Sequence, residues 1–447
     1  MSAELLTAWN RVVRRCGSER AIVQGTDGVG ATFRELDERA SAWIARAAPA
    51  GIDLRGRPIV FGLPNGIAWL EVFLGLLRAG AVAAPVDPGE PEASRGALAE
   101  SIGATGIWDG TMLRMLPGRR RFRDPDICFL KLTSGSTGAP QPLAFRSAQL
   151  LADGRQIMAT MRFGRSDLNY ALIPFGHSYG LGNLVIPLIA SGVPVVCGTA
   201  PLPHAIVSDF DRWQPSVFPG VPVIWRGLAA AGARLTGLRL AISAGAPLAP
   251  ETAGAFQAGA GVAIHSFYGS SETGGIAYDR TGRAALVGGV GRAMSGVLLT
   301  PGPGGRLAVA SAAVVTHGNR RRRGRIGSWL MPDRVAIDAR GDIVLGGRRG
   351  PTVKISGRRV SLIEVETILR KLDGVRDQWV GVGDGPEPVL GAALATTKSV
   401  AVVRSELQAM TAPWKIPKRI AVVESLPVTS RGKIDAGRVR ALVFGGR

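Results

Sequence analysis

A short loop that follows an apolar segment has the composition of a phosphate-binding loop. The segment is Phe-Leu-Lys-Leu at residues 129–132, and the loop consists of Thr133, Ser134, Gly135, Ser136, Thr137 and Gly138. Glycine lets the backbone curl, and the hydroxyl and backbone N–H groups can donate hydrogen bonds to phosphate oxygens. No Gly-Lys-Ser/Thr sequence follows at the Walker A offset, which excludes an ordinary P-loop NTPase. A flexible turn after a strand has a similar composition, so the loop alone does not establish a nucleotide site.

Other segments carry side chains suited to nucleotide chemistry. In Tyr268-Gly-Ser-Ser-Glu272-Thr, the glutamate can supply a hard oxygen ligand for the magnesium ion that accompanies ATP, and the tyrosine can stack on adenine. Three further blocks follow in order: Met331-Pro-Asp333, Gly347-Arg348 through Gly357-Arg-Arg359, and Pro427-x-Thr-x-x-Gly-Lys433-Ile-Asp435. The five blocks together resemble the adenylate-forming superfamily, which includes acyl-CoA synthetases, acyl carrier-protein ligases, peptide-synthetase adenylation domains and luciferases. The resemblance covers nearly the whole chain.

This resemblance implies which residues bind ATP and the acyl substrate. Tyr268 would stack on adenine, Asp333 would hold the ribose hydroxyls, and Glu272 would bind Mg²⁺. His177 would line the site for the carboxylate and the acyl group, and Lys433 would contact the carboxylate and the α-phosphate. The other residues implied in nucleotide or thiol binding are the phosphate loop, Gly245, Ala246, Pro247, Gly269, Ser271, Arg348, Lys354, Ser356 and Gly357.

The implied reaction activates a carboxylic acid of the fatty, aryl or polyene type. Its attack on ATP gives an acyl-adenylate, and the transition state spreads charge over phosphate oxygens, so fixed positive charge matters more than a base. The resemblance implies a large domain over residues 1–348 and a small mobile domain over residues 349–447. Rotation of the small domain would withdraw Lys433 and bring the residues around Gly357 to a pantetheine thiol, on CoA or on phosphopantetheine of an acyl carrier protein.

Two segments depart from the pattern of the superfamily. The phosphate loop normally continues with Pro-Lys-Gly, whereas this chain has Pro140-Gln141-Pro142. Gln141 still offers a hydrogen-bond donor, but a neutral donor makes a weaker bond than a charged one. The hinge carries Gly350-Pro351, where glycine permits rotation and proline restricts it. From Gln141 we expect slower adenylation or weaker ATP binding than in a typical relative, and from Gly350-Pro351 a different conformational preference of the pivot.

The apolar patterns predict the elements that must position these residues. Thr32 and Glu35 form a capping-box pattern, which predicts the start of a helix. A strand is predicted at residues 58–63, a helix at 68–80 and a second strand at 81–86. A strand, a helix and a strand in this order are typical of a parallel sheet.

The remaining patterns complete the predicted fold. Residues 171–182 predict a strand and a glycine-rich turn, with a helix from Asn183. The C-terminal part predicts a strand at residues 352–355, a helix at 361–372, and strands near Trp379 and Ile420. We predict an α/β fold, in which a large N-terminal domain of mostly parallel sheets flanked by helices is joined by a hinge to a small α+β C-terminal domain.

Length and composition indicate the number of domains and the cellular compartment of the chain. Its 447 residues exceed the size of one hydrophobic core, so at least two domains are expected. The apolar stretches are interrupted by Pro, Gly, Asn or charged residues, and no integral membrane segment is expected. The N-terminus shows no secretory signal. Cys16, Cys128 and Cys197 are odd in number and far apart, which indicates reduced thiols and a cytoplasmic protein.

The net charge of +20 leaves two kinds of acceptor open. An excess of arginine favours polyanionic partners, which include an acidic carrier protein and the phosphates of CoA, although a GC-rich genome would also produce it. The basic surface favours the carrier protein slightly. An alternative is a degenerate relative that binds a nucleotide or nucleic acid, but the retained Glu272, Asp333 and Lys433 argue against it. No acidic residue lies in Pro174–Gly182, which disfavours an amino acid as substrate.

Overall fold

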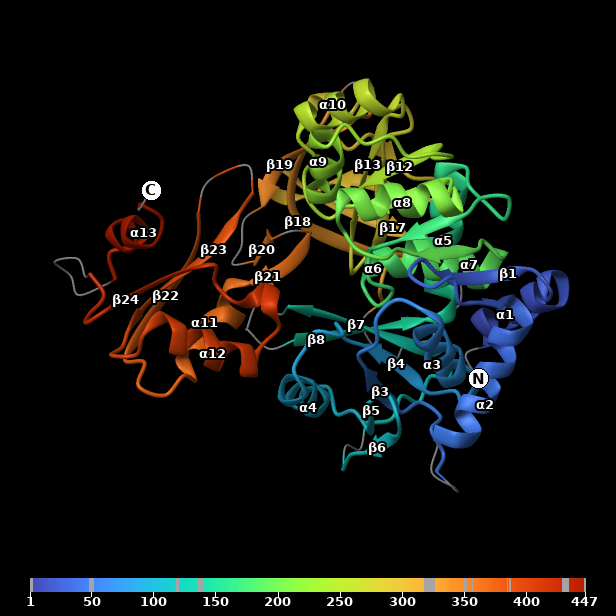
Figure 1. Ribbon diagram of the computed structural model, residues 1–447, viewed down its shortest axis with the longest axis horizontal. Coiled ribbons are helices and arrows are strands. Elements are labelled where there is room, and N and C mark those ends of the chain that lie inside the picture. The colour runs from blue at the N-terminus through green and yellow to red at the C-terminus, as the bar shows by residue number, and fades with distance from the viewer. Residues whose placement is uncertain are drawn as a thin grey trace. The chain divides into compact units, whose positions relative to one another are not determined.

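The chain folds into two units (Figure 1). In this computed structural model the described residues are 3–47, 52–117, 120–134, 140–316, 326–338, 340–348, 352–355, 357–383, 385, 387–427 and 434–445. The first unit comprises Met1–Asp87, Gly103–Lys131 and Pro142–Arg349, and the second comprises Pro88–Ile102, Leu132–Gln141 and Gly350–Arg447. No helix within the described part combines the length and the apolar character needed to cross a membrane.

A nine-stranded sheet forms the centre of the first unit, in the order β15-β14-β13-β12-β11-β9-β10-β1-β2. Its strands are β1 (Arg20–Gln24), β2 (Gly30–Thr32), β9 (Asn169–Ala171), β10 (Val195–Cys197), β11 (Val217–Gly220), β12 (Leu240–Ser243), β13 (Ile264–Ser270), β14 (Gly274–Tyr278) and β15 (Arg292–Ala293). The strands from β1 to β13 in this order pair in parallel, and β2, β14 and β15 are antiparallel additions. The carboxyl ends of β11, β12 and β13 therefore meet at one edge of the sheet.

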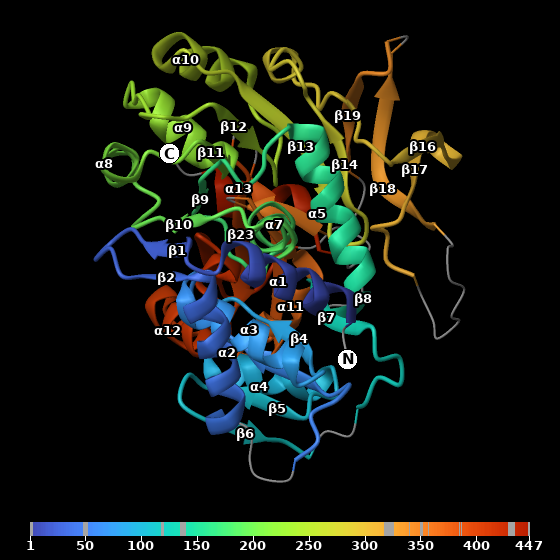
Figure 2. The same ribbon diagram turned by 90° about the vertical axis from the view of Figure 1, so that its right-hand side faces the viewer.

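Both faces of this sheet are covered by helices (Figure 2). Alternate residues of β12 show the division, because Leu240 and Ile242 belong to one core and Ala241 to another. The second core includes α8 (Pro203–Trp213), α9 (Pro222–Ala230) and α10 (Pro250–Ala260). The first core includes α1 (Ala3–Cys16), α2 (Phe33–Ala47), α3 (Ile67–Arg78), α5 (Ser147–Met161) and α7 (Ile186–Ser191).

A six-stranded sheet contributes to the first of these cores, in the order β6-β5-β3-β4-β7-β8. Its strands are β3 (Pro58–Phe61), β4 (Val82–Pro85), β5 (Gly106–Trp108), β6 (Leu113–Met115), β7 (Ile127–Ser134) and β8 (Pro140–Arg146). The predicted capping box is present: Glu35 N donates to Thr32 Oγ1 at 3.2 Å, and Thr32 N donates to Glu35 Oε2 at 2.8 Å. The predicted order of β3, α3 and β4 is also confirmed, and so is the parallel pairing of β3 with β4.

A four-stranded antiparallel sheet completes the first unit. It contains β16 (Leu298–Pro301), β17 (Arg306–Ser311), β18 (Gly327–Ile337) and β19 (Ile343–Arg348). One prediction for the first unit was wrong in its bounds, because the helix expected from Asn183 begins earlier. It starts as α6 (Ser178–Gly180), continues as the π-helix η1 (Leu181–Val185) and then becomes α7. The reason is that His177 can act as an N-cap, which moves the start of the helix into the supposed glycine-rich turn.

The second unit has an α+β arrangement, and the predicted α/β fold with a small α+β C-terminal region is confirmed. Its elements are α4 (Glu92–Ser101), β20 (Thr352–Ile355), β21 (Arg358–Ser361), α11 (Leu362–Arg370), β22 (Asp377–Gly383), β23 (Val389–Ala395), α12 (Val400–Met410), β24 (Arg419–Val423) and α13 (Ala436–Phe444). Leu390, Ala392 and Leu394 pack with α11 and α12, whereas Ala393 and Ala395 pack with α13. The sheet β22-β23-β24 therefore has helices on both faces (Figure 1).

A mostly buried ion cluster joins Glu90, which precedes α4, to the C-terminal elements of the second unit. Lys415 Nζ lies 2.8 Å from Glu90 Oε1 and 3.0 Å from Glu364 Oε1. Burial opposes the charge of Lys415, but the carboxylates of Glu364 and Glu90 raise its pKa, so the ammonium ion persists at neutral pH. Nearby, Ser94 Oγ donates to the carbonyl of Met410 at 2.6 Å. One cation thus connects segments that are separated by more than 300 positions.

Replacement of Lys415 by alanine should destabilise the second unit. Glu90 and Glu364 would remain largely buried without their cation, which costs about 3 kcal/mol for a pair of this kind. Urea unfolding followed by tryptophan fluorescence measures the change. The exposed Lys418 serves as the control, and its alanine variant should unfold at the wild-type urea concentration. Equal unfolding midpoints for the two variants would contradict the assignment of a stabilising role to Lys415.

Candidate functional site

The turn after β9 is held in place by hydrogen bonds of His177 and of the two residues that follow it. His177 caps α6, because its Nδ1 accepts a hydrogen bond from Tyr179 N at 3.4 Å. Tyr179 Oη donates to the carbonyl of Ile242 at 3.3 Å, and burial raises the pKa of Tyr179, which keeps the hydroxyl protonated. Ser178 Oγ donates to Ser271 Oγ at 3.1 Å. The turn that carries His177 is therefore bound to the loop that carries Glu272.

The π-helix behind this turn is fixed by two buried asparagines. Asn183 Nδ2 donates to the carbonyl of Tyr179 at 3.2 Å, and Asn169 Nδ2 donates to the carbonyl of Asn183 at 3.1 Å. A π-helix leaves backbone groups that a regular α-helix would satisfy, and such helices are frequent at functional sites. The two asparagine amides donate to backbone carbonyls of this segment, which helps to fix the helix that follows His177.

The segment after β12 reaches the same edge of the sheet as the turn. Gly245 has φ of +93°, a conformation that residues with side chains rarely adopt, so glycine is needed for the chain to leave the strand there. Gly245 and Ala246 are partly exposed and Pro247 is exposed. The three residues therefore present small groups and backbone at the carboxyl end of β12, where a flat ligand can approach.

The hairpin of β13 and β14 carries the central residues of the candidate site. A β-bulge lies between Tyr268 and Gly269, and bulges of this kind redirect side chains next to functional sites. In the loop, Ser270 Oγ accepts hydrogen bonds from Glu272 N at 3.2 Å and from Thr273 N at 3.3 Å. The carbonyl of Glu272 accepts from Val315 N at 2.8 Å. These bonds fix the backbone from which the Glu272 side chain projects.

Tyr268 and Asp333 are in direct contact. Tyr268 Oη donates to Asp333 Oδ2 at 2.8 Å, which joins β13 of the large sheet to β18 of the four-stranded sheet. Asp333 also lies at a β-bulge, and its Cα partner on β19 is Arg348. The contact places a phenol ring and a carboxylate together, a pair that can stack on a base and accept hydrogen bonds from ribose hydroxyls.

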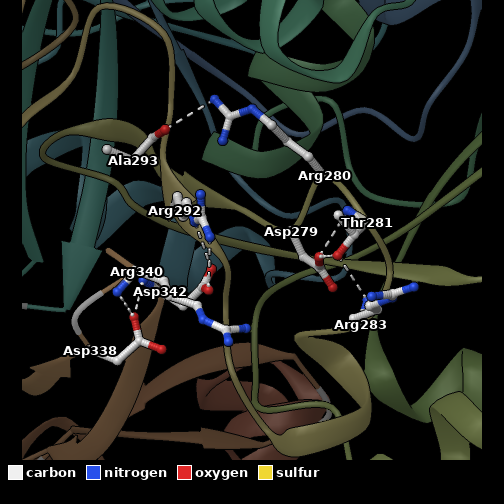
Figure 3. A network of polar contacts seen from close by, with 9 residues as sticks. All are labelled: Asp279, Arg280, Thr281, Arg283, Arg292, Ala293, Asp338, Arg340 and Asp342. Carbon is white, nitrogen blue, oxygen red and sulfur yellow. Dashed lines mark hydrogen bonds and ion pairs between the residues drawn. The ribbon is translucent and has the colours of Figure 1, made fainter.

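A polar network holds the β18–β19 hairpin in position (Figure 3). Asp338 Oδ1 accepts hydrogen bonds from the backbone N–H groups of Arg340 and Asp342, at 2.9 and 2.8 Å, and so shapes the turn. The guanidinium of Arg292, at β15, binds Asp342 through Nε at 3.1 Å. This ion pair is exposed and contributes little energy. Its effect is geometric, because it joins the edge of the large sheet to the hairpin that bears Asp333.

Two charged residues of this region were missed by reasoning from the sequence. Lys131, on β7, is 4% exposed, and Asp153, on α5, is 5% exposed. Both interact electrostatically with each other, and Lys131 also with Glu272. A signal was present in each case: a lysine interrupts the apolar segment 129–132, and an aspartate lies on the apolar face of α5 that includes Leu150, Gly154 and Ile157.

The structure brings some of the predicted site residues together, and the roles of all of them stay predictions. His177, Tyr268, Ser271, Glu272 and Asp333 are joined through the contacts given above. Lys354 and Gly357 belong to the second unit, on and beside the β20–β21 hairpin. Thr133, Ser134 and Arg348 lie on strands, and their side chains are not described. Six further residues with predicted roles lie outside the described residues, namely Gly135, Ser136, Thr137, Gly138, Ser356 and Lys433.

Comparison with known proteins adds independent information. A model of the AMP-binding enzyme family matches residues 9–109 and 115–300. Benzoate–CoA ligase of Thauera aromatica is 29% identical over 351 residues, which are 71% of this chain and 66% of the ligase. Feruloyl-CoA synthase of an Amycolatopsis species is 26% identical over 469 aligned positions, which cover 92% of this chain and 94% of the synthase.

A solved structure supports the same architecture. The o-succinylbenzoate CoA synthetase from Bacillus subtilis superposes with a TM-score of 0.82 at 16% identity, and the match covers 97% of this chain and 98% of the synthetase. At this level of identity the likeness establishes the fold alone.

Removal of the Tyr268 hydroxyl should weaken nucleotide binding. In Tyr268→Phe the ring remains, but Asp333 loses the donor that holds its carboxylate, and a hydrogen bond of this kind contributes about 0.5–1.5 kcal/mol. We expect the Kd for AMP, measured by calorimetry, to rise by up to about tenfold. Tyr278→Phe, on the neighbouring strand, is the control and should bind AMP as the wild type does. A Tyr268→Phe protein with unchanged AMP affinity would contradict the proposed use of this pair.

Proposed function

Because the chain belongs to the AMP-binding enzyme family, we propose that it joins an aromatic carboxylic acid to the thiol of CoA through an acyl-adenylate. The observation that carries the proposal is the pair of relatives named as benzoate–CoA ligase and feruloyl-CoA synthase. Benzoate and ferulate are both aromatic acids. The synthase aligns over nearly its full length, whereas the chain spans about two thirds of the ligase.

In the first step a carboxylate oxygen of the acid attacks the α-phosphorus of ATP, and pyrophosphate leaves. In the second step the sulfur of CoA attacks the adenylate carbonyl, the thiol proton is lost, and AMP leaves. Tyr268 and Asp333 are proposed to hold the adenosine, while the turn at His177 lines the acyl group. Lys433 is proposed to stabilise the negative charge that develops between the carboxylate and the α-phosphate.

A magnesium ion fits the residues of the site as a companion of ATP. Within the described residues no group of three or more His, Cys, Asp or Glu side chains could hold a metal ion by itself. Mg²⁺ commonly uses only one or two carboxylates and takes its other ligands from water and substrate phosphates. Glu272, which is 9% exposed in a fixed loop, can supply one carboxylate. The bound ion would neutralise phosphate charge.

The surroundings of His177 favour a flat, apolar acid. The rings of Tyr179 and Phe267 pack with centroids 5.7 Å apart, and both side chains are largely buried. Pro174–Gly182 contains no acidic residue, so this turn offers no counterion for the ammonium group of an amino acid. These features are compatible with an aryl acid and weigh against an amino acid.

Adenylation and thioester formation require different residues at one site. A C-terminal part that moves between the two steps would supply them in turn. We propose that residues 349–447 supply Lys433 for adenylation and the β20–β21 hairpin, with Lys354 and Gly357, for thioester formation. Gly350-Pro351 would be the pivot. A carrier-protein arm is the second candidate acceptor, because the net charge of +20 would attract an acidic domain.

A panel of acids compared with two acceptors tests the proposed function. Pyrophosphate release should be fastest with benzoate- or cinnamate-type acids, and slower with fatty acids and amino acids. With the preferred acid, thioester should form on free CoA. Transfer to a carrier protein in the absence of any transfer to CoA would reject CoA as the acceptor. Failure to release pyrophosphate with every acid would reject the ligase activity itself.

Replacement of Lys433 by alanine should separate the two steps. Without this cation the adenylation rate should fall by at least about 100-fold, because charge stabilisation of this kind contributes several kcal/mol. Thioester formation from a supplied acyl-adenylate should continue near the wild-type rate. The exposed Lys371 provides the control, and its alanine variant should retain both steps. Equal loss of both steps in Lys433→Ala would indicate a structural role only.

A further inference from the structure

Residues 88–102, which we call the strap, belong to the second unit although the strands on either side of them belong to the first. The strap connects β4 to β5 and contains α4. All residues of α4 are described, and among them Ala99 alone is buried. So little buried apolar surface stabilises the position of a helix only weakly. The polar contacts of the strap with the C-terminal elements therefore carry much of its attachment.

Two polar contacts attach the first part of the strap. Glu90 Oε1 lies 2.8 Å from Lys415 Nζ, and the two side chains are only 11% and 16% exposed. Four positions later, Ser94 Oγ donates to the carbonyl of Met410, at the end of α12, at 2.6 Å. An ion pair that is largely withdrawn from water costs much more to break than an exposed one. Glu90 is therefore the stronger of the two attachments.

The cation that Glu90 binds lies next to a residue that supports the β20–β21 hairpin. Trp414 directly precedes Lys415, and Arg358 Cζ, at the start of β21, lies 3.9 Å from the centroid of the Trp414 ring. This is a cation–π contact. Trp414 also packs against the core cluster that contains Ile355 of β20 and Val360 of β21. Both strands of the hairpin thus meet the neighbour of Lys415.

A second carboxylate binds the same ammonium group from within the C-terminal part. Glu364, in the first turn of α11, places Oε1 3.0 Å from Lys415 Nζ, and its side chain is 13% exposed. Glu90 and Glu364 are therefore matched in charge, distance and burial. They differ in what they connect, because Glu90 joins Lys415 to the strap and Glu364 joins it to α11.

We propose that Glu90 is a positioning residue for thioester formation. Its carboxylate holds Lys415, and thereby Trp414, so that the strap fixes the β20–β21 hairpin through the Arg358–Trp414 contact. This inference rests on the proposed function, because that function assigns the hairpin to the thiol step. It also extends the small domain, which the sequence placed at residues 349–447, to include the strap.

The experiment compares wild type, Glu90→Gln and Glu364→Gln, because glutamine keeps the size of the side chain and removes its charge. Adenylation is measured by pyrophosphate release, and thioester formation by a single turnover of supplied acyl-adenylate with the acceptor that the wild type uses. In Glu90→Gln the thioester rate should fall at least about tenfold while adenylation stays within about twofold, which indicates a loss confined to one step. Glu364→Gln should keep both rates within about twofold, although both variants should have a lower Tm.

Hydrogen exchange of the strap gives a readout that does not depend on activity. Amides in weakly attached segments exchange through local opening. The amides of α4 should therefore exchange at least about fivefold faster in Glu90→Gln than in wild type, and at the wild-type rate in Glu364→Gln. The comparison uses the full-length protein without ligands.

Four outcomes would overturn the inference. They are an unchanged thioester rate in Glu90→Gln, an equal loss of both steps in that variant, the same selective loss in Glu364→Gln, and wild-type exchange of α4 in Glu90→Gln. Failure of the proposed function is recognised separately, because it is seen in the wild type as absence of pyrophosphate release with every acid. Hydrogen exchange would then still show whether Glu90 attaches the strap.

Discussion

The hydrogen bond from Tyr268 to Asp333 joins two sheets that are otherwise built from separate strands. Tyr268 belongs to a mostly parallel sheet and Asp333 to an antiparallel one, and both residues lie at β-bulges. A bulge disturbs the regular alternation of side chains, so each residue can leave the face it would otherwise occupy. The rest of the site depends on this contact, because the Glu272 loop follows Tyr268 and Arg348 pairs with Asp333 across β18 and β19.

Other charged contacts of the structure differ in how far they are exposed, and therefore in what they contribute to stability. The exposed Arg292–Asp342 pair and the Asp338 turn shape the hairpin at little energetic gain (Figure 3). Lys415 is different, because its ammonium group lies between the largely buried carboxylates of Glu90 and Glu364. A buried ion cluster rarely improves stability over apolar packing, but removal of one member leaves an uncompensated buried charge, which is strongly destabilising.

The segments that carry the candidate site belong to the part of the chain that the family model matches. The matched family model covers both the Tyr268–Glu272 hairpin and the His177 turn, which places these segments within the common part of the family. The named relatives act on aromatic acids, but at 26–29% identity the acid-binding contacts can differ while the fold persists. Under the proposed function, side chains around the His177 turn determine which acid binds.

Much of the architecture was available from the sequence, because it depends on local patterns. The Thr32–Glu35 capping box, the strand at residues 352–355 and the parallel pairing of β3 and β4 all follow from short-range spacing of apolar and capping residues. The order of the motifs likewise identified the adenylate-forming fold. His177 shows the limit of this approach, since its role as an N-cap moved a helix start that composition alone had placed at Asn183.

The contacts that make the site are decided by tertiary structure. Tyr268 and Asp333 are 65 positions apart, and Asp153 and Gly275 are 122 positions apart. Strand order, register and the two bulges bring these pairs together, and none of them leaves a periodic signal in the sequence. The sequence by itself therefore determined which residue types are present and which elements carry them. The packing of sheets and helices decided which charges meet, because burial and distance set the strength of an electrostatic interaction and both are properties of the folded chain.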